Sequence, residues 1–256
     1  QTEAPLLVQP FVSKMTNSEL TAVMIGGFAT VAGGVMAMYV SMLGDIPGIA
    51  GHLLAASIMS APAALVIAKI IYPETEKSHT KGDLIISIEN EDDNVMEALA
   101  KGATNGMKLA ANVAAMLIAF VATIAMLNAI LGLFGFSLEQ ILGWLFQPLA
   151  WAMGVPWNEA NLVGSLMGKK LVLTELIAYG DLSNLLSENV LSKKSAIISS
   201  YALCGFANFA SIGIQLGGIG GIAPERRKDI SKLGIKTMFG GALASWLTAT
   251  IAGLLI

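Results

Sequence analysis

The sequence GFATVA at residues 27–32 returns far along the chain as GFANFA at residues 205–210. Both copies read Gly-Phe-Ala, then a polar residue, an apolar residue and Ala. A Thr-Glu pair precedes each copy at a comparable distance, at residues 2–3 and at residues 174–175. A match this short could arise by chance in an Ala- and Gly-rich protein, but the paired Thr-Glu signals argue against chance. The pattern predicts two related halves.

The regions around these copies are unusually apolar. Hydrophobic residues make up 55% of the 256 residues and charged residues 13%, about half the roughly 25% charge of a soluble chain. Stretches of this kind need about 20 residues to cross a bilayer. The sequence therefore predicts an all-α polytopic membrane protein embedded in a lipid bilayer. Long charge-free runs cover residues 20–44, 46–68, 109–138, 195–224 and 237–256.

The two halves are predicted to have opposite orientations in the membrane. The runs that begin at Leu20, Ile46 and Leu109 separate the first Thr-Glu pair from the second, and an odd number of crossings reverses the side of entry. Inverted repeats with interrupted helices are typical of secondary transporters, in which freed backbone carbonyls hold a coupling cation. We therefore expect an inverted-repeat transporter with interrupted transmembrane helices.

The segment between the third and fourth long runs differs from both. Trp144, Trp151 and Trp157 indicate an interfacial helix. Two short stretches follow, at residues 159–170 and 176–189, and each is too short to span a bilayer. They predict a re-entrant hairpin, whose charged tip is tolerable only beside protein or a wet cavity.

Charge outside the runs predicts the topology. The net charge is −3, and no basic tract of the kind that nucleic acid requires is present, so a nucleic-acid polymer is not expected as a partner. The link at residues 225–236 is rich in Lys and Arg, which favours the cytoplasmic side. Counting crossings back from this link also puts the polar connector at residues 73–108 inside. No Walker loop, nucleophile elbow or zinc-binding helix motif occurs, so no enzyme chemistry is expected.

Two carboxylates are predicted at membrane depth, Glu3 and Glu175. Burying such a group costs roughly 2 to 3 kcal/mol on insertion scales, so a functional role is the default expectation. The alternative for Glu175 is a structural ion pair with Lys169 or Lys170.

Polar residues in the broken helices could complete such a site. Asn208 and Ser211 are three positions apart, which predicts one shared helix face, with Phe206 as an apolar wall. Helix-to-helix hydrogen bonding is the alternative for both polar residues. Glycine pairs at residues 26–27 and 33–34 bracket Thr30 and Val31, which predicts local unwinding and carbonyls turned toward an ion, with small-residue packing as the alternative.

Five stretches in order closely resemble the concentrative nucleoside transporter family: residues 1–6, 26–35, 52–62, 204–211 and 223–227. The resemblance covers nearly the whole chain. It implies a homotrimer in which two hairpins and two interrupted helices form a mobile transport domain that moves past a fixed scaffold. It also implies coupling to Na⁺, or to H⁺ as in some bacterial members, and residence in a bacterial inner membrane. Implied substrates are nucleosides such as uridine, cytidine or adenosine.

The resemblance also implies roles for individual residues. Gln1, Thr2 and Glu3 would contact the nucleobase, and Val35 would pack on it. The hydroxyl and carbonyl of Thr30 and the carbonyl of Val31 would bind Na⁺, whereas the family's other ion ligands would precede Gln1, in an N-terminal part that we expect to be missing here. The residues that would hold the ribose are Glu175, Phe206, Asn208 and Ser211.

Combined, these readings divide the chain into nine expected segments. They are the second half of re-entrant hairpin 1 (1–18), an interrupted transmembrane helix (19–44), a transmembrane helix (45–72), a polar cytoplasmic connector (73–108), a scaffold transmembrane helix (109–138), an interfacial helix (139–157), re-entrant hairpin 2 (158–191), a second interrupted helix (192–224), and a basic cytoplasmic link with the last transmembrane helix (225–256).

Two rival functions remain open. One is a membrane enzyme acting on a nucleotide-linked lipid, for which Asp92 and Asp93 are the nearest candidate metal ligands. The other is a nucleoside-gated receptor that shares the binding site but accumulates nothing.

Overall fold

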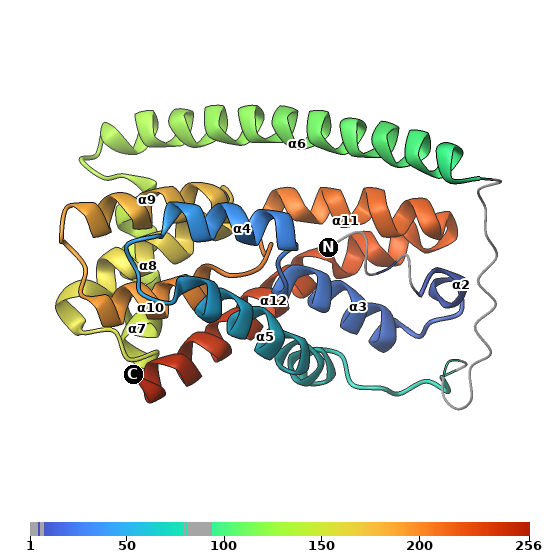
Figure 1. The fold of residues 1–256 in the computed structure, drawn as a ribbon, viewed down its shortest axis with the longest axis horizontal. Helices are drawn as coiled ribbons and strands as arrows, with labels where there is room; N and C mark the ends of the chain where they lie inside the picture. The colour runs from blue at the N-terminus through green and yellow to red at the C-terminus, as the bar shows by residue number, and fades with distance from the viewer. Residues whose placement is uncertain (1–4, 6–7, 79, 81–93) are drawn as a thin grey trace.

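The computed structural model describes residues 5, 8–78, 80 and 94–256, and all regular structure in these residues is helical (Figure 1). The all-α prediction is therefore confirmed. The helices are α2 (Gln9–Val12), α3 (Asn17–Ala29), α4 (Gly33–Met42), α5 (Ile49–Ile71), α6 (Val95–Gly132), α7 (Leu138–Ala152), α8 (Trp157–Val172), α9 (Glu175–Ser187), α10 (Lys193–Leu203), α11 (Phe209–Ile222), the short 3₁₀ helix η1 (Pro224–Arg226) and α12 (Arg227–Leu255).

Three helical stretches of the described chain are long and apolar enough to cross a membrane. They cover Asn17–Met42, Ile49–Ile71 and Pro224–Leu255. Each exceeds the roughly 20 residues that a bilayer requires. The prediction of a multi-pass membrane protein is confirmed.

Two of the apolar runs are broken into half-helices, as the sequence predicted. The first run stops at Ala29, continues through extended backbone at Thr30, and resumes as α4 at Gly33. The second stops at Leu203 and resumes as α11 at Phe209. The copies are not identical in conformation, because residues 27–29 are helical in the first copy whereas residues 205–207 lie in the break of the second.

The second break packs directly against the end of α3. Gly205 has a φ of 95°, in the left-handed region, and a Cβ at this position would lie 2.7 Å from the carbonyl oxygens of both Phe28 and Ala29. Only glycine permits this approach without strain. Helix α12 packs against both broken helices and α5 and forms the centre of the bundle (Figure 1).

Helices α8 and α9 form a helical hairpin that turns at Leu173 and Thr174, and α7 packs closely on α8. The contact depends on Gly164, where a Cβ would lie 2.7 Å from the carbonyl oxygen of Gly143. The indole side chains of Trp144 and Trp151 are exposed. At the hairpin turn, Lys170 and Glu175 make hydrogen bonds to the second broken helix.

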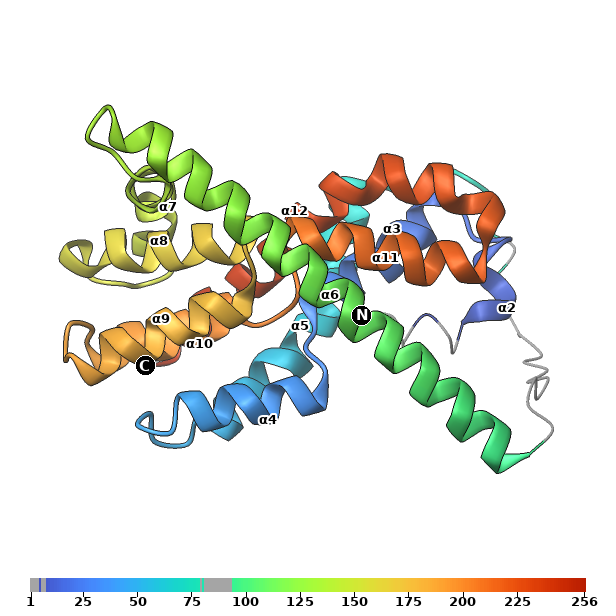
Figure 2. The same cartoon turned by 90° about the horizontal axis from the view of Figure 1, so that it is seen from above.

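Helix α6 is longer than the sequence predicted. It has 38 residues and begins at Val95, so the last part of the expected connector at 73–108 is helical. The side chain of Asn94 caps the helix by accepting a hydrogen bond from the backbone N–H of Glu97. Charged residues interrupted the apolar run, but they do not interrupt a helix. Figure 2 shows α6 crossing obliquely over the other helices.

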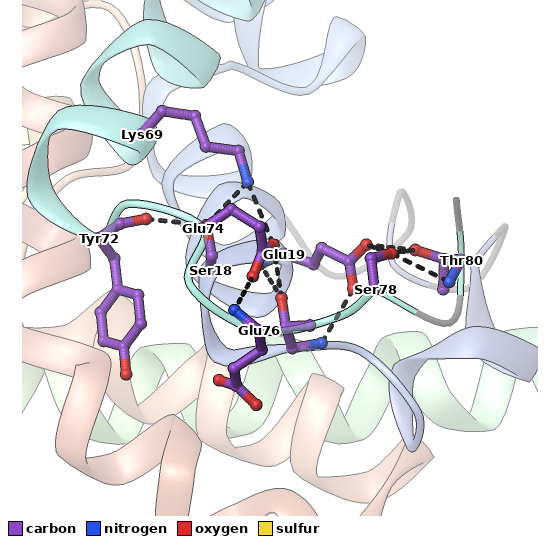
Figure 3. A network of polar contacts seen from close by, with 9 residues as sticks. Ser18, Glu19, Lys69, Tyr72, Glu74, Glu76, Ser78 and Thr80 are labelled. Carbon is purple, nitrogen blue, oxygen red and sulfur yellow. Dashed lines mark hydrogen bonds and ion pairs between the residues drawn. The ribbon is translucent and has the colours of Figure 1, made fainter. Parts of the chain in front are cut away.

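The start of the connector is fastened to the first turn of α3 (Figure 3). One carboxylate, that of Glu19, accepts hydrogen bonds from the hydroxyls of Ser78 and Thr80. Glu74 accepts a hydrogen bond of 2.8 Å from the hydroxyl of Thr16, and Thr16 is also the N-cap residue of α3. These contacts anchor the chain that leaves α5 beside the beginning of the first broken helix.

Candidate functional site

Glu175 is the first residue of α9 and is 5% exposed. One carboxylate oxygen, Oε1, accepts a hydrogen bond of 3.1 Å from the Tyr39 hydroxyl, and the other, Oε2, accepts one of 2.9 Å from the Asn208 amide. The donors come from α4 and from the second break, so three separate elements meet at this carboxylate. A buried carboxylate held by neutral donors keeps lone pairs free for hydroxyl groups of a solute.

Asn208 lies in the break rather than on a helix face with Ser211, which corrects the sequence prediction. Its backbone is extended, and its side-chain oxygen accepts a bond of 2.8 Å from the backbone N–H of Ser211, which makes Asn208 the N-cap of α11. The amide is thereby used at both ends, because Nδ2 donates to Glu175. Spacing of three residues brought the pair together through capping geometry.

The remaining predicted site residues differ in burial and in their contacts. Ser211 is 2% exposed, and Phe206 is half-buried. Val31 and Val35 are half-buried and pack against the main hydrophobic core. Thr30 donates its hydroxyl to the carbonyl of Gly26 at 2.9 Å, within its own helix. Of the residues predicted to hold a ribose, Glu175, Asn208 and Ser211 are linked by hydrogen bonds. Gln1, Thr2 and Glu3 lie outside the described residues.

Tyr39 is a site residue that the sequence analysis missed. It is 1% exposed and stacks on Tyr179 with ring centroids 4.1 Å apart. The Tyr179 hydroxyl in turn donates to the carbonyl of Ser200 at 2.7 Å. The available signal was a lone phenol in a charge-free run, one helical turn after Val35. Buried tyrosines nearly always find a partner for the hydroxyl.

The two lysines at the end of α8 have separate partners. Lys169 pairs with Asp181 at 2.5 Å on the half-exposed side of the hairpin, which overturns its alternative as a partner of Glu175. Lys170 is fully buried and donates to the carbonyls of Ala202 and Cys204 at 3.0 and 2.9 Å. It attracts Glu175 electrostatically without a hydrogen bond between them.

The described residues contain no cluster of three or more His, Cys, Asp or Glu side chains that could hold a metal ion. Asp92 and Asp93, the candidate ligands of the enzyme alternative, lie outside the described residues. A carboxylate, an amide and a capped helix N-terminus from different elements can bind a polar solute without forming a covalent bond.

The chain is similar to known proteins over nearly its whole length. A family model described as "Na+ dependent nucleoside transporter C-terminus" matches residues 52–253. The "Uncharacterized transporter YutK" of Bacillus subtilis is 49% identical over 264 residues, which cover 100% of this chain and 64% of that protein. "Solute carrier family 28 member 3" of Mus musculus is 42% identical and covers 100% of this chain and 39% of its own length.

A solved structure matches as well. "Structure of CNTnw in an inward-facing substrate-bound state" has 47% identity and a TM-score of 0.85, and it covers 99% of this chain and 61% of that chain. The chain thus spans less than two thirds of the length of these relatives.

Broken helices, a helical hairpin and a buried polar centre are typical of membrane transporters, and the relatives described above that carry a functional name are transporters. Within that class, the chain belongs to the Na⁺ dependent nucleoside transporter family. The family resemblance read from the sequence is confirmed.

Proposed function

We propose that the protein containing this chain is a secondary active symporter that takes up nucleosides together with Na⁺ moving down an inward gradient. The observation that carries the proposal is the buried Glu175 carboxylate, held by Tyr39 and Asn208 where the hairpin turn meets the second break. An intramembrane carboxylate is expensive to bury and is a functional group by default. Ribose hydroxyls are suitable donors to its remaining lone pairs.

The proposed solute contacts follow from this centre. Glu175, Asn208 and Ser211 bind the ribose, and Phe206 packs on its apolar face. Val35 packs on the nucleobase, which Gln1, Thr2 and Glu3 contact through polar groups. The substrates are nucleosides of the size of uridine, cytidine or adenosine.

The proposed ion site is the first break. Extended backbone at Thr30 turns carbonyl groups out of the helix, and such freed carbonyls bind Na⁺ in transporters with interrupted helices. Thr30 offers its hydroxyl and carbonyl, and Val31 its carbonyl. This assignment agrees with relatives that are named "Sodium/nucleoside cotransporter 1" and "Sodium/nucleoside cotransporter 2".

The proposed movement is that of an elevator. The α8–α9 hairpin is re-entrant, and it travels with the broken helices past a scaffold that includes α6, within a homotrimer. The connector and the basic link face the cytoplasm, α7 lies at the membrane interface, and the protein resides in a bacterial inner membrane. Identities of 49% and 47% with transporters of Bacillus subtilis and Haemophilus influenzae support this residence.

Radiolabelled uridine uptake into proteoliposomes tests the proposal. Full-length wild type should accumulate uridine under an imposed inward Na⁺ gradient, and Glu175→Gln should abolish accumulation because the carboxylate is lost. Glu159→Gln is the matched control, since Glu159 accepts hydrogen bonds from Ser192, away from Tyr39 and Asn208. Accumulation driven only by a pH gradient would replace Na⁺ by H⁺. Binding without accumulation would favour a receptor, and no handling of any nucleoside would refute the proposal.

A further inference from the structure

Lys170 is the only fully buried charged side chain among the described residues. Its ammonium donates to two backbone carbonyls, those of Ala202 and Cys204. An isolated ammonium in an apolar interior is strongly unfavourable unless other groups compensate its charge. The contacts of Lys170 are therefore the reason that its charge can stay in the core of the molecule.

The carbonyls that Lys170 contacts belong to the end of α10, where the helix breaks. Cys204 is the C-cap of α10, and its carbonyl also accepts a hydrogen bond of 2.6 Å from Ser245. Terminal carbonyls lack partners within the helix and form the negative end of its dipole. Converging carbonyl oxygens at an interrupted helix are the surroundings that an alkali cation takes in a transporter.

The first break offers the equivalent carbonyls with different partners. In both copies of the repeat, the relevant residues are the third and the first before the shared glycine, so Ala202 and Cys204 correspond to Met24 and Gly26. The side chain of Gln215 donates to Met24 at 2.9 Å, and the hydroxyl of Thr30 donates to Gly26. These donors are neutral.

We propose that Lys170 is a tethered cation: its ammonium holds the carbonyls at the end of α10, whose counterparts in the first half have neutral donors, so that the second break needs no cation from solution. The second half of the repeat is then permanently loaded, and only the first half needs an ion from solution. Lys170 acts as a positioning residue, because its hydrogen bonds to Ala202 and Cys204 fix the end of α10 shortly before Asn208. The inference rests on the proposed function and deepens it.

Uridine binding to the purified full-length protein, measured by calorimetry over a range of Na⁺ concentrations, tests this role. Lys170→Met keeps the volume but removes the charge, and should weaken uridine binding by roughly tenfold or more at saturating Na⁺. Lys170→Ala leaves room for a free cation. Uridine binding by this variant should recover with added methylammonium or with high Na⁺. Its Hill coefficient for Na⁺ should rise from the wild-type value of about one towards about two.

The matched control is Lys169→Met, which removes the neighbouring lysine and its ion pair with Asp181 on the half-exposed side. It should bind uridine with wild-type affinity and wild-type Na⁺ dependence. The thermal unfolding midpoint of each variant is measured in parallel, so that a loss of uridine binding caused by misfolding is recognised.

Three results would overturn the inference. They are wild-type uridine affinity in Lys170→Met, a folded Lys170→Ala protein that no cation restores, and a wild-type protein that requires two Na⁺ per uridine. The last is measured on the wild type alone, so it decides the matter even where the variants do not fold. A wild type that binds no nucleoside would refute the proposed function and this inference together, whereas normal wild-type binding with unaffected Lys170 variants refutes this inference alone.

Discussion

The two interrupted helices carry related sequences, yet their breaks differ in how their polar groups are satisfied. At the second break, the carbonyl of Cys204 accepts hydrogen bonds from Lys170 and Ser245, and the amide of Asn208 donates one to Glu175. Most residues of this break are buried. At the first break, Thr30 bonds only within its own helix among the contacts described, and the backbone that follows is half-exposed.

The polar groups of the second break are therefore already satisfied within the protein, whereas those of the first break remain open to a further ligand. Groups that the protein already satisfies need no reorganisation when a solute arrives. Half-exposed groups at the first break remain accessible, and the proposed function assigns them to Na⁺. Substitutions at corresponding or neighbouring positions of the two breaks therefore test the comparison directly.

The largest effect is expected from Gly205→Ala, because the second break leaves no space for a Cβ. The left-handed φ costs about 1 to 2 kcal/mol and the overlap with the Phe28 and Ala29 carbonyls about 1 to 3 kcal/mol more. Thermal unfolding of the full-length protein in detergent should show a strongly lowered midpoint. Gly26 lies one residue before Gly27, the counterpart of Gly205, and a Cβ at Gly26 meets nothing within 4 Å, so Gly26→Ala should leave the midpoint unchanged or raise it. Equal effects would mean that the breaks are equally tolerant.

A smaller effect is expected at the polar residue of each copy. Asn208→Ala removes both the cap of α11 and a donor to Glu175, which should weaken uridine binding by about 3 kcal/mol. Thr30→Ala removes only a bond within its own helix, so uridine affinity at saturating Na⁺ should change little while the Na⁺ requirement rises. Titrations of each variant with uridine at several Na⁺ concentrations distinguish these outcomes. Similar uridine losses in both would contradict the proposed division between solute and ion.

The smallest effect is expected from Tyr39→Phe. Tyr39, on α4 of the first half, donates a hydrogen bond to Glu175 of the second half. The variant keeps the ring stacked on Tyr179 and loses only the hydroxyl that donates to Glu175, so uridine affinity should fall by about 1.5 kcal/mol. Calorimetry measures the loss. Tyr201→Phe is the control, because the Tyr201 hydroxyl lies 3.3 Å from His52 Nδ1 rather than near Glu175. An unchanged affinity in Tyr39→Phe would remove α4 from the solute site.

The helical class, the two breaks and the polar residues Glu175 and Asn208 were predictable from sequence. Long charge-free runs predict spans because water is excluded from the bilayer core, and the repeated Gly-Phe-Ala motif predicts where helices stop. Glu175 and Asn208 stood out because charge and amide groups are costly at membrane depth. Such signals depend on composition and local spacing, which a sequence displays directly.

The features that were missed depend on tertiary contacts or on local helix propensity. Tyr39 and Lys170 acquire their roles from partners far away in the chain, which spacing does not reveal. The start of α6 was placed too late because apolarity, rather than propensity, was used to locate it. Asn94 caps a helix that includes the charged residues Glu97 and Lys101, because charged residues are compatible with a helix even where they end an apolar run.

The length of α6 has a consequence for how the molecule meets the bilayer. At about 1.5 Å per residue, its 38 residues extend about 57 Å, whereas the hydrocarbon layer is about 30 Å thick. Even at a tilt of about 40°, the steep end of the usual range, the helix rises about 44 Å. That height equals the full membrane with its headgroups. On the proposed assignment of α6 to the scaffold, the helix is long enough to reach both lipid surfaces at once, whereas each half-helix of 10 to 14 residues is about 15 to 21 Å long and spans about half of the membrane at most.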